Sequence, residues 1–379
     1  MVGNAFDLTG APLHQIELLE GLASHHVRTS WVHANLPGVL SERIRAFGVS
    51  AVSTGHPLAN AQDLPAYETA VAEFADRLVQ GGAEVVFANT LEAFYAVDAA
   101  RRAGLPAIWN IHESEPSHAY FERFGSAIAE RARTCLAYPY RVIFTSDATM
   151  RVHADLDTHN NFTLIRSGLD NRRVALASPA SRANSRRALG AQPSDIVLLL
   201  VGTVCARKAQ IDLVSALAQM REASVARTRC VFVGDRPSAY SEHLHECIRS
   251  LPARRRGRVT VVAETAEVAG YYQAADVFIC TSLIECFPRV ILEAMAHGLP
   301  IISTDVFGIP EQVIDGVNGL LFTPGDVPAL ARHIEEFVVN EPRRRQMAAR
   351  SADALACLPS FEEMLGRYAE LIHEANSLR

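Results

Sequence analysis

The feature that most constrains the fold is an alternation of short apolar runs with longer amphipathic stretches, which occurs twice along the 379 residues. Such alternation predicts parallel sheets with helices on both faces, and a chain of this length exceeds one ordinary core. We therefore expect an α/β protein of two doubly wound domains, residues 1–172 and residues 173–360. The runs expected to be strands are residues 27–32, 49–53, 84–89, 107–111, 142–145, 162–165, 196–201, 230–234, 259–262, 277–280 and 301–304.

Composition limits the class of protein. Apolar residues make up 49% and charged residues 21% of the chain, which is typical of a soluble globular protein. No apolar run approaches the ~20 residues needed to cross a bilayer, and no signal peptide is visible at the start. Seven scattered cysteines without a CxxC pair indicate reduced thiols and a cytoplasmic protein. The net charge of −6 argues against binding to nucleic acid.

Residues 281–300, TSLIECFPRVILEAMAHGLP, predict a strand end, a short loop and a helix. Pro288 suits the first helical position, because it has no N–H to lose there. Gly298 suits a left-handed cap at the helix end. Two carboxylates bracket the turn, with Glu285 in the loop and Glu293 inside the helix. The helix start offers free backbone N–H groups, which suit an anion or a hydroxyl-rich ligand.

The string E-x-F-x-x-V-x-x-E-A-M-A-x-G-x-P in this stretch resembles the EX7E signature of retaining glycosyltransferases of the GT4 family. The resemblance implies the GT-B fold, in which two Rossmann-like domains face a central cleft and the second binds a nucleotide-sugar. It also implies that Glu285 holds hydroxyls of the donor sugar and Glu293 those of the ribose. In this fold a terminal helix crosses back, so residues 361–379 are assigned to the first domain.

A second motif follows the apolar run at residues 196–201. Gly202 lets the backbone approach a ligand closely, and Arg207 and Lys208 stand near the start of the next helix, where cations can clamp a diphosphate. The stretch is similar to the family pattern G-x-x-x-x-R-K. Many members have arginine directly after the glycine, where this chain has Thr203, so Arg207 is expected to carry more of the phosphate contact.

The resemblance extends to other donor contacts. The loop at residues 263–265 matches the segment whose backbone contacts the base in the family, and the base itself stays open. Backbone N–H groups at the start of the EX7E helix are expected to help stabilise the leaving diphosphate. The remaining donor-binding residues predicted in this way are Thr203, Thr265, Cys286, Phe287, Pro288 and Arg289.

In the first half, His112 and Glu113 directly follow the apolar run at residues 107–111. Parallel sheets bind ligands at the carboxyl ends of their strands, and an imidazole there can donate to a sugar hydroxyl or to a developing charge. The family often carries histidine at this position, so His112 is expected at the reaction centre. For Glu113 the expected role is contact with the acceptor.

The amino terminus departs from the family pattern. A buried strand normally precedes the Gly-Ala-Pro loop, yet the residues before Gly10 contain no run rich in valine or isoleucine. We therefore expect the first strand to be missing, which suggests a piece of a larger polypeptide, a shortened chain or a true departure. By resemblance, Gly10 and Ala11 would approach the phosphate or the acceptor.

These observations predict a metal-independent hexosyltransferase that moves a sugar, with retention, to a glycan or lipid-linked hydroxyl in cell-surface polysaccharide synthesis. The donor is a nucleotide-diphosphate-sugar, and no cofactor is expected. The protein would be cytoplasmic, with peripheral contact at the inner face of the membrane as a further option. Two alternatives stay open: another GT-B enzyme such as an epimerase, and a non-catalytic nucleotide-sugar-binding or partner domain of a larger glycosyltransferase.

Overall fold

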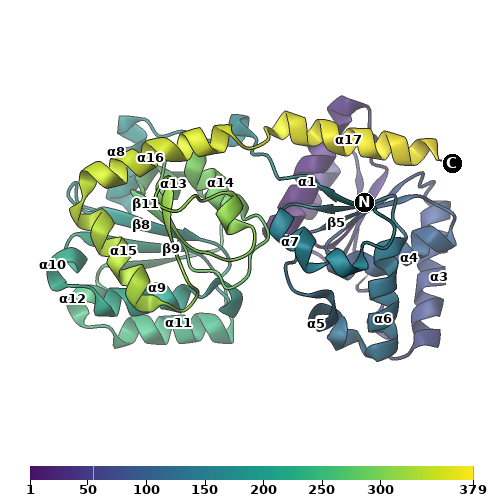
Figure 1. The fold of residues 1–379 in the computed structure, drawn as a ribbon, viewed down its shortest axis with the longest axis horizontal. Coiled ribbons are helices and arrows are strands. Elements are labelled where there is room, and N and C mark those ends of the chain that lie inside the picture. Colours follow the sequence, from purple (N-terminus) through teal and green to yellow (C-terminus); the bar gives the residue numbers. More distant parts are fainter. Residues whose placement is uncertain (54, 379) are drawn as a thin grey trace. The chain divides into compact units, whose positions relative to one another are not determined.

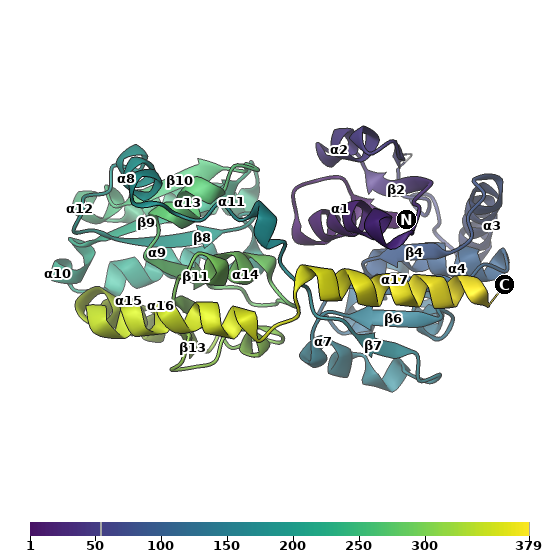
Figure 2. The same ribbon diagram turned by 90° about the horizontal axis from the view of Figure 1, so that it is seen from above.

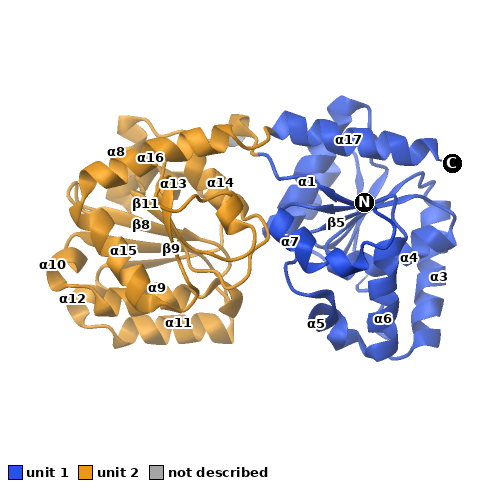
Figure 3. Cartoon of the chain, in the orientation of Figure 1, with its two compact units in different colours: residues 1–168, 361–379 blue, residues 169–360 orange. Residues whose placement is uncertain are grey.

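The computed structural model describes residues 1–53 and 55–378. The chain divides into two compact units (Figure 3). Unit 1 comprises residues 1–168 and 361–379, and unit 2 comprises residues 169–360. The division lies slightly before the boundary expected at residue 172, and the terminal helix belongs to unit 1.

Unit 1 is built on a seven-stranded sheet in the order β3-β2-β1-β4-β5-β6-β7, and neighbouring strands run parallel (Figure 1). The strands are β1 (Val2–Ala5), β2 (Trp31–Leu36), β3 (Ser50–Ser53), β4 (Val86–Asn89), β5 (Ala107–Ile111), β6 (Arg141–Phe144) and β7 (Phe162–Leu164). The helices are α1 (Gly10–Leu22), α2 (Leu40–Ala46), α3 (Leu64–Gln80), α4 (Phe94–Arg102), α5 (Ser117–Phe121), α6 (Ser126–Thr134), α7 (Asp147–Val152) and α17 (Phe361–Ser377).

The expectation of a missing first strand is wrong. Strand β1 lies in the middle of the sheet, where Val2 pairs with both His33 of β2 and Ala88 of β4. The strand escapes a search for apolar runs because it has only four residues and includes a glycine. A Cβ on Gly3 would lie 2.3 Å from Oε1, at the flexible end of the Gln15 side chain on α1, so a larger residue here would displace that side chain.

Strand β2 also differs from the prediction, since it covers Trp31–Leu36 rather than residues 27–32. It buries two polar residues that a search for apolar runs excludes, His33 and Asn35. Both find partners in the core. Asn35 accepts a hydrogen bond of 2.8 Å from the Tyr95 hydroxyl, and the His33 ring packs edge-on against Phe74 with 5.2 Å between ring centroids.

The two faces of the unit 1 sheet are covered by different helices. One core joins the sheet to α3, α4 and α6, and the other face is covered by α1, α2 and α17. Helices α1 and α17 pack closely (Figure 2), since a Cβ on Gly21 would lie 2.4 Å from the Leu365 side chain. The chain's last helix is thus part of the core of the first unit.

Unit 2 contains a six-stranded parallel sheet in the order β10-β9-β8-β11-β12-β13. Its strands are β8 (Ile196–Val201), β9 (Thr228–Asp235), β10 (Val259–Ala263), β11 (Val277–Cys280), β12 (Ile301–Thr304) and β13 (Gly319–Phe322). Its helices are α8 (Pro179–Ala188), α9 (Gln210–Gln219), α10 (Glu222–Val225), α11 (Ala239–Ser250), α12 (Ala253–Arg256), α13 (Ala269–Ala274), α14 (Arg289–Ala296), α15 (Val327–Val339) and α16 (Glu341–Ala356).

Apolar side chains on both faces of this sheet form separate cores with the helices on each side. Strand β8 is buried over nearly its whole length, which explains its unbroken apolar sequence. Strand β13 was not predicted, because its four residues lie within a glycine-rich stretch. Within the described residues, no helix is both long and apolar enough to cross a bilayer.

Candidate active site

In unit 2, the turns at the carboxyl ends of β8 and β9 pack tightly together. Gly202, directly after β8, has φ +148, a value that favours glycine. A Cβ on Gly234 in β9 would lie 2.4 Å from the carbonyl oxygen of Gly202, so this turn has no room for a side chain. Thr203 donates from Oγ1 to Glu264, which follows β10, over 3.3 Å. The predicted loop that contains Thr265 therefore contacts the Gly202 turn.

The two predicted cations lie in a short 3₁₀ turn, Ala206–Lys208, which ends at a residue in left-handed conformation, Ala209 with φ +47. Backbone contacts tie this turn to the loop after β11. The carbonyl oxygen of Arg207 accepts from the N–H of Leu283 at 2.8 Å, and that of Lys208 accepts from Oγ1 of Thr281 at 2.7 Å. The fold thus brings the two predicted motifs of unit 2 together.

Lys208 forms an ion pair through Nζ with Oε1 of Glu285, and Nη1 of Arg207 lies 3.5 Å from the same oxygen. Glu285 is buried, and burial acts to raise the pKa of its carboxyl. The charges of Lys208 and then Arg207 outweigh burial, so the pKa of Glu285 lies below its ordinary value and the group is ionised at neutral pH. Sequence reasoning assigned these residues separately and did not predict that they pair.

Helix α14 begins one residue later than expected. Pro288 is its N-cap, with φ −64 and an extended ψ of 118, rather than its first helical residue. Proline still suits the position, because the observed φ is the one that its ring imposes and because the helix needs no N–H from this residue. Cys286 and Phe287 are buried in the loop before it. The helix ends as predicted, with Gly298 in left-handed conformation at φ +65.

Glu293 lies half-buried on α14, and both of its oxygens have partners. Oε1 accepts from Nε of Arg289 at 2.7 Å, and Oε2 accepts from the buried hydroxyl of Tyr272 at 2.8 Å. These two donors hold the carboxylate in one orientation. Arg289, predicted as a donor contact through its backbone, therefore also positions Glu293 through its side chain.

In unit 1, three neighbouring segments meet around the predicted His112. Its Nε2 lies 2.8 Å from Nδ2 of Asn110 on β5 and 2.9 Å from Oδ1 of Asn89 on β4. Nδ2 of Asn89 in turn donates to the carbonyl oxygen of Ala11, in the first turn of α1, at 3.1 Å. The structure thus joins His112 to the predicted Gly10–Ala11 segment. Burial lowers the pKa of His112 to about 4, so the ring is neutral at pH 7.

Gly10 begins α1, and its N–H and that of Ala11 are the first two of the helix, which have no intrahelical acceptor. A Cβ on Gly10 would meet no atom of the described residues within 4 Å. Internal packing therefore does not explain the glycine.

The Glu113 carboxylate accepts hydrogen bonds from two backbone N–H groups. Oε2 accepts from the N–H of Leu91 at 2.9 Å and from that of His112 at 3.1 Å. Burial raises the pKa of Glu113 to about 7, although these hydrogen bonds oppose the shift. Glu113 therefore titrates near neutral pH and holds the loop that carries His112.

This shift predicts a pH-dependent stability difference for Glu113→Gln. Between the ordinary pKa of 4.5 and about 7, the folded carboxyl keeps a proton that the unfolded one loses. Its stabilising contribution is therefore complete below pH 4.5 and is lost as the pH rises through 7. The glutamine variant has no such loss. Urea unfolding measures this difference. The free energy of unfolding of the variant, minus that of the wild type, should rise by about 2–3 kcal/mol from pH 5 to pH 8. A constant difference would contradict the assignment.

Two residues of this cluster were missed by sequence reasoning, His14 of α1 and Tyr368 of α17. The Tyr368 hydroxyl donates to Oδ1 of Asn110 at 3.0 Å and lies 3.4 Å from Nε2 of His14. The His14 ring stands edge-on to that of His112, with 5.2 Å between ring centroids. The signal available in the sequence was a tyrosine on the inner face of an amphipathic terminal helix, which core packing explains equally well.

Tyr368 is a positioning residue for His112 in this arrangement, because it acts through Asn110. We expect Tyr368→Phe to lower kcat of a reaction in which His112 takes part about tenfold, while the Kd of a ligand bound at Lys208 and Glu285 stays within twofold. The pKa of His112, followed by NMR, should shift away from about 4 as the ring loosens. Tyr140→Phe is the matched control, since it removes another tyrosine hydroxyl bonded to α17, at Glu374, outside this cluster. If Tyr368→Phe and Tyr140→Phe changed kcat and the pKa of His112 equally, Tyr368 would not be a positioning residue for His112.

No group of three or more metal-ligating side chains occurs among residues 1–53 and 55–378. The cations described above, Arg207 and Lys208, could balance the charge of a diphosphate.

Residues 181–353, most of unit 2, match the family Glycosyl transferases group 1. This match covers somewhat less than half of the chain. It confirms the predicted resemblance to a GT4-type glycosyltransferase. One similar curated protein is D-inositol 3-phosphate glycosyltransferase of Corynebacterium diphtheriae, which is 33% identical over 48% of this chain and 44% of its own length. Another is alpha-maltose-1-phosphate synthase of Mycobacterium tuberculosis, which is 32% identical over 45% of this chain and 44% of its own length. The matches thus span somewhat less than half the length of these relatives.

Solved structures confirm the predicted GT-B architecture of two parallel-sheet α/β domains. The Anabaena protein HepE, solved in complex with UDP-glucose, is 21% identical to this chain. It matches with a TM-score of 0.82 over 98% of this chain and 99% of its own. At this identity the likeness concerns the fold.

Proposed function

We propose that this protein is a glycosyltransferase that moves a hexose from a nucleotide-diphosphate-sugar to a hydroxyl group, with retention of configuration at the anomeric carbon. The observation that carries the proposal is the convergence of Lys208 and Arg207 on the buried, ionised Glu285. A site with two cations and one carboxylate has a net positive charge, which suits a diphosphate. It lies at the carboxyl edge of a parallel sheet, where such folds bind ligands.

In this proposal Lys208 and Arg207 stabilise the charge that develops on the leaving nucleoside diphosphate. Backbone N–H groups at the start of α14 add to the same effect. Glu285 accepts from hydroxyls of the donor sugar, and its ion pair keeps Lys208 in place before the donor binds. Glu293, held by Arg289 and Tyr272, accepts from the ribose hydroxyls.

Unit 1 would supply the acceptor side. His112 is neutral at pH 7 and can offer one N–H to a sugar hydroxyl without adding a charge. The free N–H groups of Gly10 and Ala11 would contact a phosphate or the acceptor, and Glu113 would support the loop. The acceptor is a glycan or lipid-linked hydroxyl in surface polysaccharide synthesis, which places the protein in the cytoplasm with peripheral access to the membrane.

The reaction breaks the bond between the anomeric carbon and the diphosphate oxygen and forms one to the acceptor oxygen. The acceptor hydroxyl loses its proton to an oxygen of the departing phosphate, on the same face of the sugar. In this mechanism Lys208 and Arg207 supply the positive charge at the diphosphate, so EDTA should leave the activity unchanged.

A donor screen tests the proposal. Thermal shifts are measured with UDP-, GDP- and dTDP-sugars, starting with UDP-glucose because HepE was solved with it, and transfer is then assayed with the donors that bind. NMR of the product identifies the anomeric configuration. We expect one donor class to raise Tm and to support transfer with retention. Epimerisation or hydrolysis without an acceptor would replace this function by that of another GT-B enzyme, and binding without transfer to any acceptor would indicate a non-catalytic domain.

A further inference from the structure

A polar cavity lies in unit 2, at the opposite edge of the sheet from Lys208 and Glu285. Its volume is about 490 Å³, which is in the range of small-molecule sites. Its lining residues 195, 227 and 276 directly precede β8, β9 and β11, residue 196 begins β8, and residue 299 lies two residues before β12. The donor motifs follow β8 and β11. Because β8 is six residues long, the two edges are roughly 20 Å apart.

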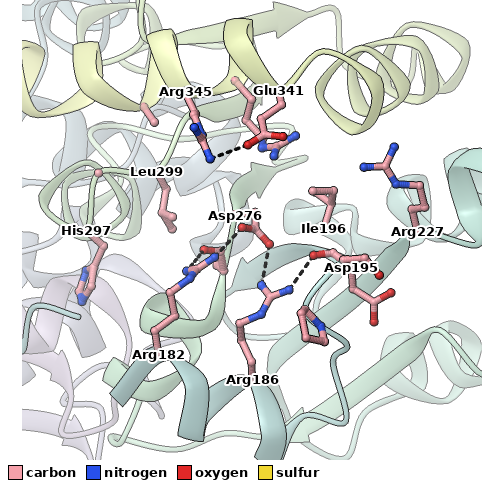
Figure 4. A pocket seen from close by; sticks show the side chains of 16 residues that line it. Arg182, Arg186, Asp195, Ile196, Arg227, Asp276, His297, Leu299, Glu341 and Arg345 are labelled. Atoms are coloured by element: carbon pink, nitrogen blue, oxygen red, sulfur yellow. Dashed lines mark hydrogen bonds and ion pairs between the residues drawn. The ribbon is translucent and has the colours of Figure 1, made fainter. Parts of the chain in front are cut away.

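Arginine side chains dominate this cavity. Five of them, on α8, before β9 and on α16, face three carboxylates (Figure 4). Arg182 and Arg186 point from α8 toward Asp276, while Glu341 and Arg345 stand on the opposite side, on α16 (Figure 4). The full set of charged lining residues is Arg182, Arg186, Asp195, Arg227, Asp276, Glu341, Arg344 and Arg345.

The three carboxylates each form ion pairs. Asp276 accepts from Arg182 at 2.5 Å, from Arg186 at 2.8 Å and from the N–H of Val197 at 2.8 Å. Asp195 pairs with Arg258, which is not a lining residue, at 2.9 Å. Glu341 pairs with Arg345 at 2.6 Å. These contacts explain the structural role of Arg182, Arg186 and Arg345, and the five arginines of the lining outnumber its three carboxylates.

The other two arginines of the lining are Arg227 and Arg344. Neither forms an ion pair in the part of the chain that the structure describes, and Arg344 donates from Nη1 to the carbonyl oxygen of Phe337. Arg344 is half-buried. Burial lowers its pKa, the carboxylates of Asp276 and Glu341 oppose this shift, and the charges of Arg227 and Arg345 add to it to a smaller extent. Cations close enough to disfavour one another are stabilised by a bound anion.

We propose that this cavity is a second ligand site, which binds a phosphate or diphosphate group through Arg227 and Arg344. The excess of arginines over carboxylates in the lining suits the negative charge of a phosphate ester, and arginine binds phosphate oxygens in bidentate geometry. The site is separate from the donor motifs, so a ligand here binds together with the donor rather than in its place. The phosphate group belongs either to a soluble metabolite or to a lipid headgroup.

Calorimetry with inorganic pyrophosphate on the full chain tests the site. Arg227→Gln is the main variant, because Arg227 is exposed and no contact of the described residues depends on its side chain. We expect it to weaken binding at this site about tenfold, as the loss of a charged hydrogen-bond partner does. Arg344→Gln should act similarly. Arg249→Gln is the control, because it removes an exposed arginine from α11 outside the cavity. Its affinity for pyrophosphate should stay within twofold of the wild-type value.

A vesicle assay distinguishes the two sources. Sedimentation with phosphatidylcholine vesicles that contain phosphatidic acid, compared with pure phosphatidylcholine, reports binding to a lipid phosphate. Loss of this binding in Arg227→Gln assigns the site to a lipid, and loss of pyrophosphate binding alone assigns it to a soluble metabolite. If neither probe binds, or if Arg227→Gln and Arg249→Gln bind both probes as wild type does, the proposed site is wrong. The assignment of the donor site is unaffected by either result.

Discussion

Replacing Lys208 by alanine is expected to lower kcat of sugar transfer by about 10²–10³-fold, while KM for the donor changes only a few-fold. The loss is of the size found when one preorganised group that stabilises a transition-state charge is removed. In the free protein the Lys208 ammonium is paired with the buried Glu285 carboxylate. In the reaction it would also face the charge that develops on the departing diphosphate, so its main effect falls on the transition state. Steady-state kinetics with the donor found in the screen measures both quantities.

A control for folding is needed, because Lys208→Ala leaves Glu285 buried with one cation fewer. The double variant Lys208→Ala/Glu285→Gln removes the uncompensated charge. It should recover most of the lost stability but none of the lost rate. Lys208 is the only lysine in the sequence, so a lysine-directed reagent labels one side chain besides the α-amino group. Bound donor should protect Lys208 from the label. Full activity of Lys208→Ala would overturn its role.

The second large effect is expected for Glu293→Ala, which should weaken donor binding about 10- to 100-fold with a smaller change in kcat for bound donor. A carboxylate that accepts from both ribose hydroxyls contributes charge-assisted hydrogen bonds, each worth about 1.5–3 kcal/mol. The ribose is remote from the bond that breaks, so the contact contributes equally to the ground state and the transition state. Calorimetry with the donor or its nucleoside diphosphate measures the affinity.

Glu293→Gln separates this effect from simple loss of structure. The alanine variant leaves the buried Tyr272 hydroxyl without its 2.8 Å acceptor, which itself costs about 1–3 kcal/mol of stability. Glutamine can still accept from Tyr272 but no longer carries the charge. We expect near-normal Tm and an intermediate donor affinity for this variant. If both variants bind the donor as tightly as wild type, Glu293 does not contact it.

The sequence predicted most of the second unit, because its signals are local. The unbroken apolar run of β8, the glycine at position 202 and the left-handed Gly298 each depend on neighbours in the chain. Predictions were poorer where a strand is short or carries polar residues. Strand β1 was missed because Gly3 makes room for Gln15, and β2 was misplaced because it buries His33 and Asn35. In both cases partners from other elements replace the apolar side chains that a sequence search expects.

By itself, the sequence determined the α/β class, the resemblance to GT4 glycosyltransferases and the individual residues of the candidate donor site, because strand and helix periodicity and the two motifs are properties of contiguous residues. Only the tertiary structure decided which of those residues act on one another. Lys208 and Glu285 are 77 residues apart, and Tyr368 and Asn110 are 258 apart. The arginines of the cavity at the amino edge of the second sheet likewise come from separate segments. Their charges and hydrogen bonds meet only after the strands align, and no local pattern encodes that alignment.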